Sequence, residues 1–266
     1  MTDVNASPLS VIQRVRAWVA MALGLGTLGV FCVLWWPVAA VLAAVMPEAT
    51  GQRVGRRALH LGARLYVRWL QLACGCRFDL QALTGLAQEG PMVVAANHPS
   101  LLDAVLLLAY LPNAVCVMKT ALQDNWLFGP AARLAGFVPN RDALEMVLRG
   151  REVLDGGAQL IIFPEGTRTV QSPMNTLQSG AAMIATKAKV PMQVLTLTYS
   201  SPYLGKHWPL FRPPQLPLVV RARRVARFAP AEHAQALTAA MEASFQQALA
   251  EQEETDVPLH ATAPAG

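Results

Sequence analysis

Charged residues are scarce in this sequence: they make up 15% of the chain, whereas hydrophobic residues make up 53%. Soluble domains carry about 25% charged residues on average, so this scarcity argues against an ordinary water-soluble enzyme and indicates contact with lipid. Acidic residues are the scarcer kind, which leaves a net charge of +5. This charge suits an anionic membrane surface or a phosphorylated substrate, and it does not form the separate basic arm expected of a protein that binds nucleic acid.

Cysteine is also sparse, with four residues in 266. Cys32, Cys74, Cys76 and Cys116 have neither the spacing of a disulfide framework nor that of a metal site. We expect all four to be reduced and mostly buried, as unpaired cysteines commonly are. Reduced thiols favour a catalytic part that faces the cytoplasm, and no metal is predicted.

Charge is absent altogether from the 30 residues between Ala17 and Met46. A membrane-spanning helix needs about 20 apolar residues, and the run is too long for the apolar core of a signal peptide. Pro37 interrupts the run and arginines flank both ends, so a helical hairpin is favoured over a single bent helix. We therefore expect a membrane-attachment segment over residues 1–50, in the cytoplasmic (inner) membrane, with the catalytic domain facing the cytoplasm.

The next segment, residues 51–76, combines a basic stripe with an apolar face at helical spacing. The stripe consists of Arg53, Arg57, His60, Arg64 and Arg68, and the apolar face consists of Leu59, Leu65, Tyr66, Trp69, Leu70 and Ala73. This pattern predicts an amphipathic helix that lies in the lipid interface. The alternative is an ordinary surface helix packed on the domain.

Short apolar strands alternate with helices through residues 77–250. The expected strands are 92–96, 114–118, 137–138, 160–163, 192–198 and 218–222, and the expected helices are 101–111, 126–134, 142–154, 180–189 and 231–250. Such alternation predicts an α/β domain with a mainly parallel sheet flanked by helices. The last residues, 251–266, are acidic and then rich in Ala, Thr and Pro, so we expect a disordered tail there.

Polar residues follow the first of these strands, in the run Asn97-His98-Pro99-Ser100-Leu101-Leu102-Asp103. His98 lies at a strand end, where ligands and catalytic groups of α/β sheets collect. Asp103 falls in the first helical turn, from which a carboxylate can hold one imidazole nitrogen and leave the other free to accept a proton. The alternative is a capping arrangement in which Ser100 and Asp103 only satisfy helix amides.

A second polar cluster follows a later strand, in the run Phe163-Pro164-Glu165-Gly166-Thr167-Arg168. Arg168 has a planar fork suited to phosphate, Glu165 suits a polar headgroup or the positioning of Arg168, and Gly166 permits a tight turn. The alternative is a strand-ending turn with a surface ion pair. Lys119 and Arg141 also follow strands, so basic side chains are expected along one edge of the sheet, where they favour an anionic ligand.

These motifs resemble those of the glycerolipid acyltransferase family, typified by bacterial 1-acylglycerol-3-phosphate acyltransferases. The resemblance covers four motifs between about Pro91 and Thr198: Asn97-His98-x-x-x-x-Asp103, Gly136-Phe137-Val138 with Arg141, Phe163–Arg168, and Val190-Pro191. It implies that His98 is the general base, that Asp103 is its partner, and that the fourth motif's proline lies near the acyl site. It also implies that the acceptor's glycerol phosphate part is bound by Arg141, Glu165, Gly166 and Arg168, and Lys119 and Thr167 complete the expected substrate-binding set.

The resemblance implies a lysophospholipid acyltransferase of phospholipid biosynthesis. The donor would be acyl-CoA or acyl-acyl carrier protein, the acceptor a membrane lipid such as 1-acylglycerol-3-phosphate, and no cofactor, metal or covalent acyl-enzyme is implied. The chain departs from the family pattern at Pro139-Asn140, Gln193 and Thr169–Pro173, around the expected acceptor pocket. The alternatives are an acyltransferase for a specialised lipid, a hydrolase with Ser100 as nucleophile, and a non-catalytic membrane lipid-binding protein.

Overall fold

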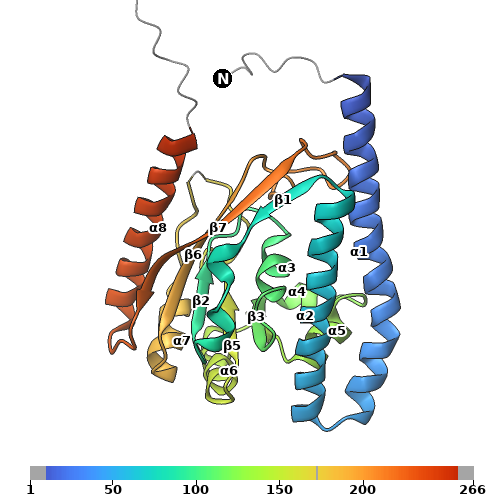
Figure 1. Ribbon diagram of the computed structural model, residues 1–266. Helices are drawn as coiled ribbons and strands as arrows, with labels where there is room; N and C mark the ends of the chain where they lie inside the picture. Colours follow the sequence, from blue (N-terminus) through green and yellow to red (C-terminus); the bar gives the residue numbers. More distant parts are fainter. Residues whose placement is uncertain (1–9, 172, 257–266) are drawn as a thin grey trace, which may run out of the picture.

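The computed structural model describes residues 10–171 and 173–256. Within these residues, seven strands form one sheet in the order β1-β7-β6-β2-β5-β3-β4 (Figure 1). The strands are β1 Cys76–Asp79, β2 Val93–Ala96, β3 Ala114–Met118, β4 Val138–Pro139, β5 Gln159–Ile162, β6 Met192–Tyr199 and β7 Leu218–Phe228. The helices are α1 Val11–Val45, α2 Glu48–Ala73, α3 Asp103–Leu108, α4 Thr120–Gln123, α5 Gly129–Ala135, α6 Ala143–Asp155, α7 Gly180–Ala188 and α8 Ala234–Asp256, with 3₁₀ turns at Gln81–Leu83 and Leu86–Gln88.

The sheet is mainly parallel, which confirms the predicted fold class. β2 pairs in parallel with β5 and β6, β3 pairs in parallel with β5 and β4, and β1 pairs in parallel with β7. The exception is the antiparallel pair of β6 and β7, which has a bulge between Val194 and Leu195. The sequence does not predict β1, because its four residues alternate in polarity directly after a long helix and carry no turn signal of their own.

Helices cover both faces of the sheet (Figure 1). On one face, Val94 and Leu197 share an apolar core with residues of α2 and α3. On the other face, Val93 and Val194 share a second core with residues of α6, α7 and α8. All of β2 is buried, as expected for a central strand that is covered on both sides. The carboxyl end of this strand is therefore a rigid place from which to present a side chain.

The two N-terminal helices run antiparallel (Figure 1). α1 continues unbroken through Pro37, and the chain reverses at Met46-Pro47 instead. The prediction of a hairpin inside the apolar run is therefore wrong. A proline removes only one backbone N–H donor from a helix, and the helical turns on either side of Pro37 remain intact. Among the described residues, α1 alone is long and apolar enough to cross a membrane, with a mean hydropathy of 2.3.

α1 contacts the rest of the protein in both of its halves. Tyr66 OH donates a hydrogen bond to Gly24 O at 3.1 Å. Farther along the helix, the rings of Trp36 and Trp126 meet edge to face with their centroids 6.1 Å apart. The opposite side of α1 is apolar and exposed, for example at Val19, Leu34 and Val41.

α2 packs on the domain with one face and exposes much of the other. Four arginines of the expected basic stripe are exposed, namely Arg53, Arg57, Arg64 and Arg68. His60 does not belong to that stripe, since it is buried and its Nδ1 lies 2.8 Å from Leu108 O. The prediction is wrong at this position because one turn of the stripe faces α3, where the imidazole finds a backbone carbonyl as its partner.

A buried arginine and a close backbone approach fasten α2 to α5. Arg56 Nε donates to Ala135 O at 3.0 Å, and its Nη1 donates to Asn113 Oδ1 at 3.1 Å. Burial lowers the pKa of the Arg56 guanidinium. At Gly55 a Cβ atom would lie 2.8 Å from Leu134 O, so this position has no room for a side chain. The contact fixes α5, and with it the start of β4, against the N-terminal helices.

The C-terminal helix extends farther than expected. α8 ends at Asp256, so residues 251–256 are helical and the prediction of disorder is wrong for them. Glutamate and glutamine are good helix formers, which explains why the helix continues through this acidic stretch. The remainder of the expected tail, residues 257–266, lies outside the described residues.

Candidate functional site

Four neighbouring parallel strands deliver the expected site residues to one edge of the sheet. His98 follows β2, the run Glu165–Arg168 follows β5, Lys119 follows β3 and Arg141 follows β4. These strands are adjacent in the order β2-β5-β3-β4. The carboxyl ends of parallel strands form the edge where α/β sheets bind ligands. The predicted residues therefore share the edge at which chemistry is expected.

His98 is held by two contacts. Its Nδ1 lies 2.8 Å from Asp103 Oδ2, and its ring stacks on Phe163 with the centroids 4.1 Å apart and the planes 18° from parallel. An ionised Asp103 accepts this bond, which places the proton on Nδ1 and leaves Nε2 as the nitrogen that can accept one. The arrangement has the geometry of a general base with a fixed tautomer.

Asp103 is fully buried and accepts two further hydrogen bonds. Ser100 N donates to Oδ2 at 2.8 Å, and Tyr199 OH donates to Oδ1 at 2.5 Å. Burial raises the pKa of the Asp103 carboxyl, and the bonds from His98, Tyr199 and Ser100 act in the opposite direction. Burial and the adjacent Asp103 raise the pKa of the Tyr199 phenol well above its usual value, so the phenol stays protonated and remains a donor.

The Ser100 side chain forms its hydrogen bonds within the protein. Its Oγ donates to Tyr203 O at 2.9 Å and accepts from Leu102 N at 3.3 Å, and the residue is 1% exposed. The capping alternative is thus present in part, because Asp103 serves the Ser100 N–H and His98 at once. A buried hydroxyl that donates to a backbone carbonyl is not placed to act as a nucleophile.

Glu165 joins the two motif loops. Its Oε1 accepts hydrogen bonds from His98 N and Thr169 Oγ1, each at 2.8 Å, and its Oε2 accepts from Asn175 N at 2.9 Å. In return, Thr169 N donates to His98 O at 2.7 Å. Glu165 is 4% exposed. Bonds to an ionised acceptor are among the stronger ones in proteins, so this carboxylate holds the backbone of His98 in place.

Gly166 and Arg168 shape the loop after β5. Gly166 has φ +65°, in the left-handed region that glycine adopts without strain, and a Cβ there would lie 2.8 Å from Gln178 Nε2. Arg168 Nη1 donates to Leu204 O at 2.9 Å and to Gly205 O at 2.8 Å. Arg168 therefore fastens the connection between β6 and β7 to the site.

Two lysines converge on the hydroxyl of Thr167. Lys119 Nζ lies 3.5 Å and Lys206 Nζ 2.9 Å from Thr167 Oγ1. Within the described part of the chain, no carboxylate forms an ion pair with either ammonium group. Two cations at one hydroxyl favour an anion beside them. The sequence does not predict Lys206, because it lies in the β6–β7 connection, outside the recognised motifs, and tertiary hydrogen bonds from Arg168, Ser100 and Leu101 bring that connection here.

Arg141 is exposed at the outer strand of this row. The residue before it has a structural part: Asn140 N donates to Met118 O at 2.9 Å, and Asn140 Oδ1 accepts from Thr120 N at 3.3 Å. Asn140, at which the sequence departs from the family pattern, thus joins the end of β4 to the start of α4.

The fourth motif lies away from His98. Pro191 precedes β6, and its carbonyl accepts a hydrogen bond from Val93 N at 3.0 Å, at the amino end of β2. His98 follows the carboxyl end of the same strand, so the length of β2 separates the two. Gln193 is also remote from the anion-favouring edge, since its Nε2 donates to Ala226 O at 3.0 Å beside the β6–β7 bulge. Its departure from the family pattern therefore concerns sheet geometry rather than the acceptor pocket.

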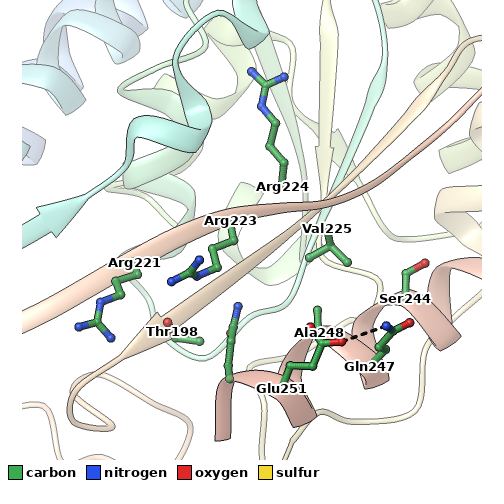
Figure 2. A pocket seen from close by; sticks show the side chains of 10 residues that line it. Thr198, Arg221, Arg223, Arg224, Val225, Ser244, Gln247, Ala248 and Glu251 are labelled. Carbon is green, nitrogen blue, oxygen red and sulfur yellow. Dashed lines mark hydrogen bonds between the residues drawn. The ribbon is translucent and has the colours of Figure 1, made fainter. Parts of the chain in front are cut away.

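A cavity of about 430 Å³ lies elsewhere, between β7 and α8 (Figure 2). Arg223 and Ser244 are among its lining residues, and Arg224 points away from the helix, where it donates to Ala82 O at 2.6 Å and Thr84 O at 2.8 Å. The residues that line this cavity in the described chain include none of those expected in the site. The cavity is therefore separate from the His98 edge.

The comparisons with known proteins agree with one another, since each match described below is an acyltransferase. Residues 77–198 match the profile of the family described as Acyltransferase. A chloroplastic 1-acyl-sn-glycerol-3-phosphate acyltransferase of Brassica napus is 29% identical over 180 residues, which cover 63% of this chain and 52% of that protein. A 1-acyl-sn-glycerol-3-phosphate acyltransferase of Helicobacter pylori is 30% identical over 139 residues, 48% of this chain and 59% of that protein. The chain thus spans between half and two thirds of the length of these two relatives.

Two further similarities cover more of the chain. The 1-acyl-sn-glycerol-3-phosphate acyltransferase of Pseudomonas aeruginosa is 23% identical over 207 residues, 76% of each protein. The crystal structure of the 1-acyl-sn-glycerophosphate acyltransferase PlsC from Thermotoga maritima has the same fold, with a TM-score of 0.68 at 18% identity over 95% of this chain and all of that one. Residues 77–198 of this chain are thus similar to the family described as Acyltransferase, and the fold of the chain is that of the Thermotoga maritima enzyme.

Proposed function

We propose that this protein transfers a fatty acyl group from a thioester, carried by coenzyme A or acyl carrier protein, to a hydroxyl of a lysophospholipid such as 1-acylglycerol-3-phosphate. The observation that carries the proposal is the 2.8 Å pair of His98 and Asp103, at the same sheet edge as the two lysines that meet at Thr167. A base suits the hydroxyl and two cations suit the phosphate. The names of the relatives support the same acceptor.

His98 acts as the general base in this proposal. Its Nε2 takes the proton of the acceptor hydroxyl while that oxygen attacks the thioester carbonyl carbon. A carbon–oxygen bond forms, the carbon–sulfur bond breaks, and the leaving thiolate takes the proton back from His98. Asp103 keeps the Nδ1 proton in place and stabilises the imidazolium between these steps. The buried Ser100 hydroxyl supports direct transfer rather than a covalent acyl-enzyme.

Lys119 and Lys206 bind the acceptor phosphate, with Thr167 between them. Each ammonium group supplies a point charge, and the shared hydroxyl orients both. Arg168 contributes by holding the connection that carries Lys206, and its remaining guanidinium donors can also reach an anion. Arg141 adds positive charge at the outer end of the same edge. Glu165 and Gly166 act through the shape of the loop.

The protein works at the cytoplasmic face of the inner membrane in this proposal. The exposed apolar side of α1 supports attachment to lipid, and α1 contacts the domain in both of its halves, at Gly24 and at Trp36. A helix held in this way carries the domain with it to the bilayer surface. The acceptor and the product are then membrane lipids, and the donor comes from the cytoplasm.

The experiment that tests the proposal is an acyl-transfer assay on the full chain in lipid vesicles. Acyl-CoA and acyl-acyl carrier protein are offered in turn against a panel of lysophospholipids, with products identified by mass spectrometry. We expect phosphatidic acid from 1-acylglycerol-3-phosphate. Free fatty acid as the sole product would show a hydrolase. Acylation of some other lipid in the panel, with 1-acylglycerol-3-phosphate untouched, would favour a specialised acceptor.

A further inference from the structure

The segment between β3 and β4 carries exposed apolar side chains close to the site. Leu122 is 44% exposed, Trp126 68% and Phe128 43%. One exposed apolar residue is ordinary on a protein surface. Three large ones within residues 122–128 are unusual for a connection at the ligand-binding edge of a sheet, where polar residues normally dominate. The segment therefore presents an apolar surface whose contact with water is unfavourable.

This surface is built into the fold. Asn125 Oδ1 accepts hydrogen bonds from Leu127 N at 2.9 Å and from Phe128 N at 3.2 Å, which fixes the turn. Arg133 Nη1 donates to Gln123 O at 2.8 Å and joins α4 to α5. A fixed turn holds its apolar side chains outward, because they have no freedom to fold back onto the domain.

The surface is also continuous with α1. The ring of Trp126 meets the ring of Trp36 edge to face, and the neighbouring α1 residues Val33 and Leu34 are exposed. Most of α1, including Trp36, lies in the stretch from residue 17 to residue 46, which carries no charge. An outward face of this kind is suited to lipid rather than to water. The same bilayer that receives α1 therefore reaches Trp126.

Lys119 connects this surface to the proposed phosphate site. It is the residue directly before α4, and its ammonium group lies 3.5 Å from Thr167 Oγ1. Tryptophan prefers the boundary between hydrocarbon and headgroups, and lysine extends its charge from that boundary toward water. A lipid acceptor whose acyl chain stays in the bilayer would thus have its phosphate beside Lys119.

We infer that Leu122, Trp126 and Phe128 form a second lipid-contacting element, which inserts into the interfacial layer of the bilayer and seats the mouth of the site on it. The inference rests on the proposed function for the identity of the acceptor. The contact with lipid itself does not depend on activity, so it can be tested separately.

Site-directed labelling tests the contact directly. Leu122→Cys, in a chain with Cys32→Ser, is labelled with an environment-sensitive fluorophore; Leu148→Cys on α6, where the native leucine is equally exposed at 44%, is the control. Vesicles of phosphatidylcholine and phosphatidylglycerol are added, with and without nitroxide-labelled lipid. We expect a blue shift and quenching at position 122 and neither at position 148. An unquenched label at position 122 on membrane-bound protein would overturn the inference, whether or not the enzyme is active.

Kinetics test the consequence for the site. In the triple variant Leu122→Ser/Trp126→Ser/Phe128→Ser, we expect the apparent KM for a long-chain acceptor in vesicles to rise roughly tenfold, because the lost apolar contact weakens seating on the bilayer. The KM for a short-chain, water-soluble acceptor stays within about twofold of the original value, as do both values in Leu148→Ser. Equal loss on both acceptors would show a structural role instead. A smaller assembly on sizing in detergent would identify the surface as a contact between copies of the chain.

Discussion

Tyr199 ends strand β6, and its phenol donates a hydrogen bond at 2.5 Å to Asp103, which lies 96 positions earlier in the chain. The buried carboxylate thus accepts bonds from the imidazole, a backbone amide and a phenol. Burial opposes its ionisation and the three donors favour it. His98 requires Asp103 in its ionised form. That form therefore depends in part on Tyr199, which belongs to β6, whereas His98 follows β2.

Tyr199→Phe tests this dependence through pH. Activity that needs an ionised Asp103 is lost as the pH falls through the pKa of that carboxyl. Removal of a donor to the carboxylate raises this pKa, so the acid limb of the kcat/KM profile should move to higher pH, with roughly tenfold lower activity at the lower end. Tyr203→Phe, a change at another buried ring, is the matched control. An acid limb that stays in place would show that the phenol does not tune Asp103.

Lys206→Gln tests the phosphate site. The KM for 1-acylglycerol-3-phosphate should rise roughly tenfold with little change in kcat, because one of two cations at Thr167 is lost. An uncharged monoacylglycerol acceptor should be used as before, and Lys187→Gln on the opposite face of the sheet should change neither value. If KM for the phosphorylated acceptor is unaffected, Lys206 contributes only to the shape of its loop.

Two glycines of α2 give opposite expectations for stability. Gly55→Ala places a Cβ 2.8 Å from the backbone of α5, so we expect the free energy of unfolding to fall by about 1–3 kcal/mol. Gly62→Ala meets no atom of the described chain within 4 Å and should stabilise the helix by about 0.5–1 kcal/mol. Thermal unfolding in detergent measures both. A Gly55→Ala variant as stable as the parent would show that α2 and α5 are not held in close contact.

Two buried cysteines, Cys76 and Cys116, should be inert in the native protein. All four are free, as the sequence predicts, and burial raises the pKa of the Cys76 and Cys116 thiols to about 12. At pH 8 the reactive thiolate is then about one part in 10⁴ of each. A chromogenic disulfide reagent should leave both untouched until a denaturant exposes them, and their reactivity should rise only as the pH approaches that pKa. Rapid reaction of the native Cys116 would contradict its placement in β3.

The sequence alone predicts the local parts of this structure well. β3 occupies the expected residues, and His98 and the run Glu165–Arg168 follow buried strands as expected, because strands covered on both faces read as short apolar runs. Residues whose place depends on tertiary contacts are not predictable in this way. Tyr199 acquires its part from the pairing of β6 with β2, and Lys206 from the bonds of Arg168 to a distant loop.

The reversal of the N-terminal helices shows the same limit. Pro37 is a local signal for a break, yet the helix continues through it and turns at Met46-Pro47. α1 packs against both α2 and α5, and sequence patterns do not report that packing. His60 likewise fits a basic stripe by spacing and is buried because α3 lies against it.

The most direct test of the central claim is single-turnover acyl transfer by His98→Ala in lipid vesicles, with 1-acylglycerol-3-phosphate and the preferred donor. If His98 is the base, the rate should fall by roughly 10²–10⁴. The variant's unfolding temperature and membrane attachment should match those of the parent, which would separate loss of the base from loss of the fold. A His98→Ala protein that is folded, bound to membranes and still transfers acyl groups at near the original rate would contradict the assignment of His98 and the mechanism built on it.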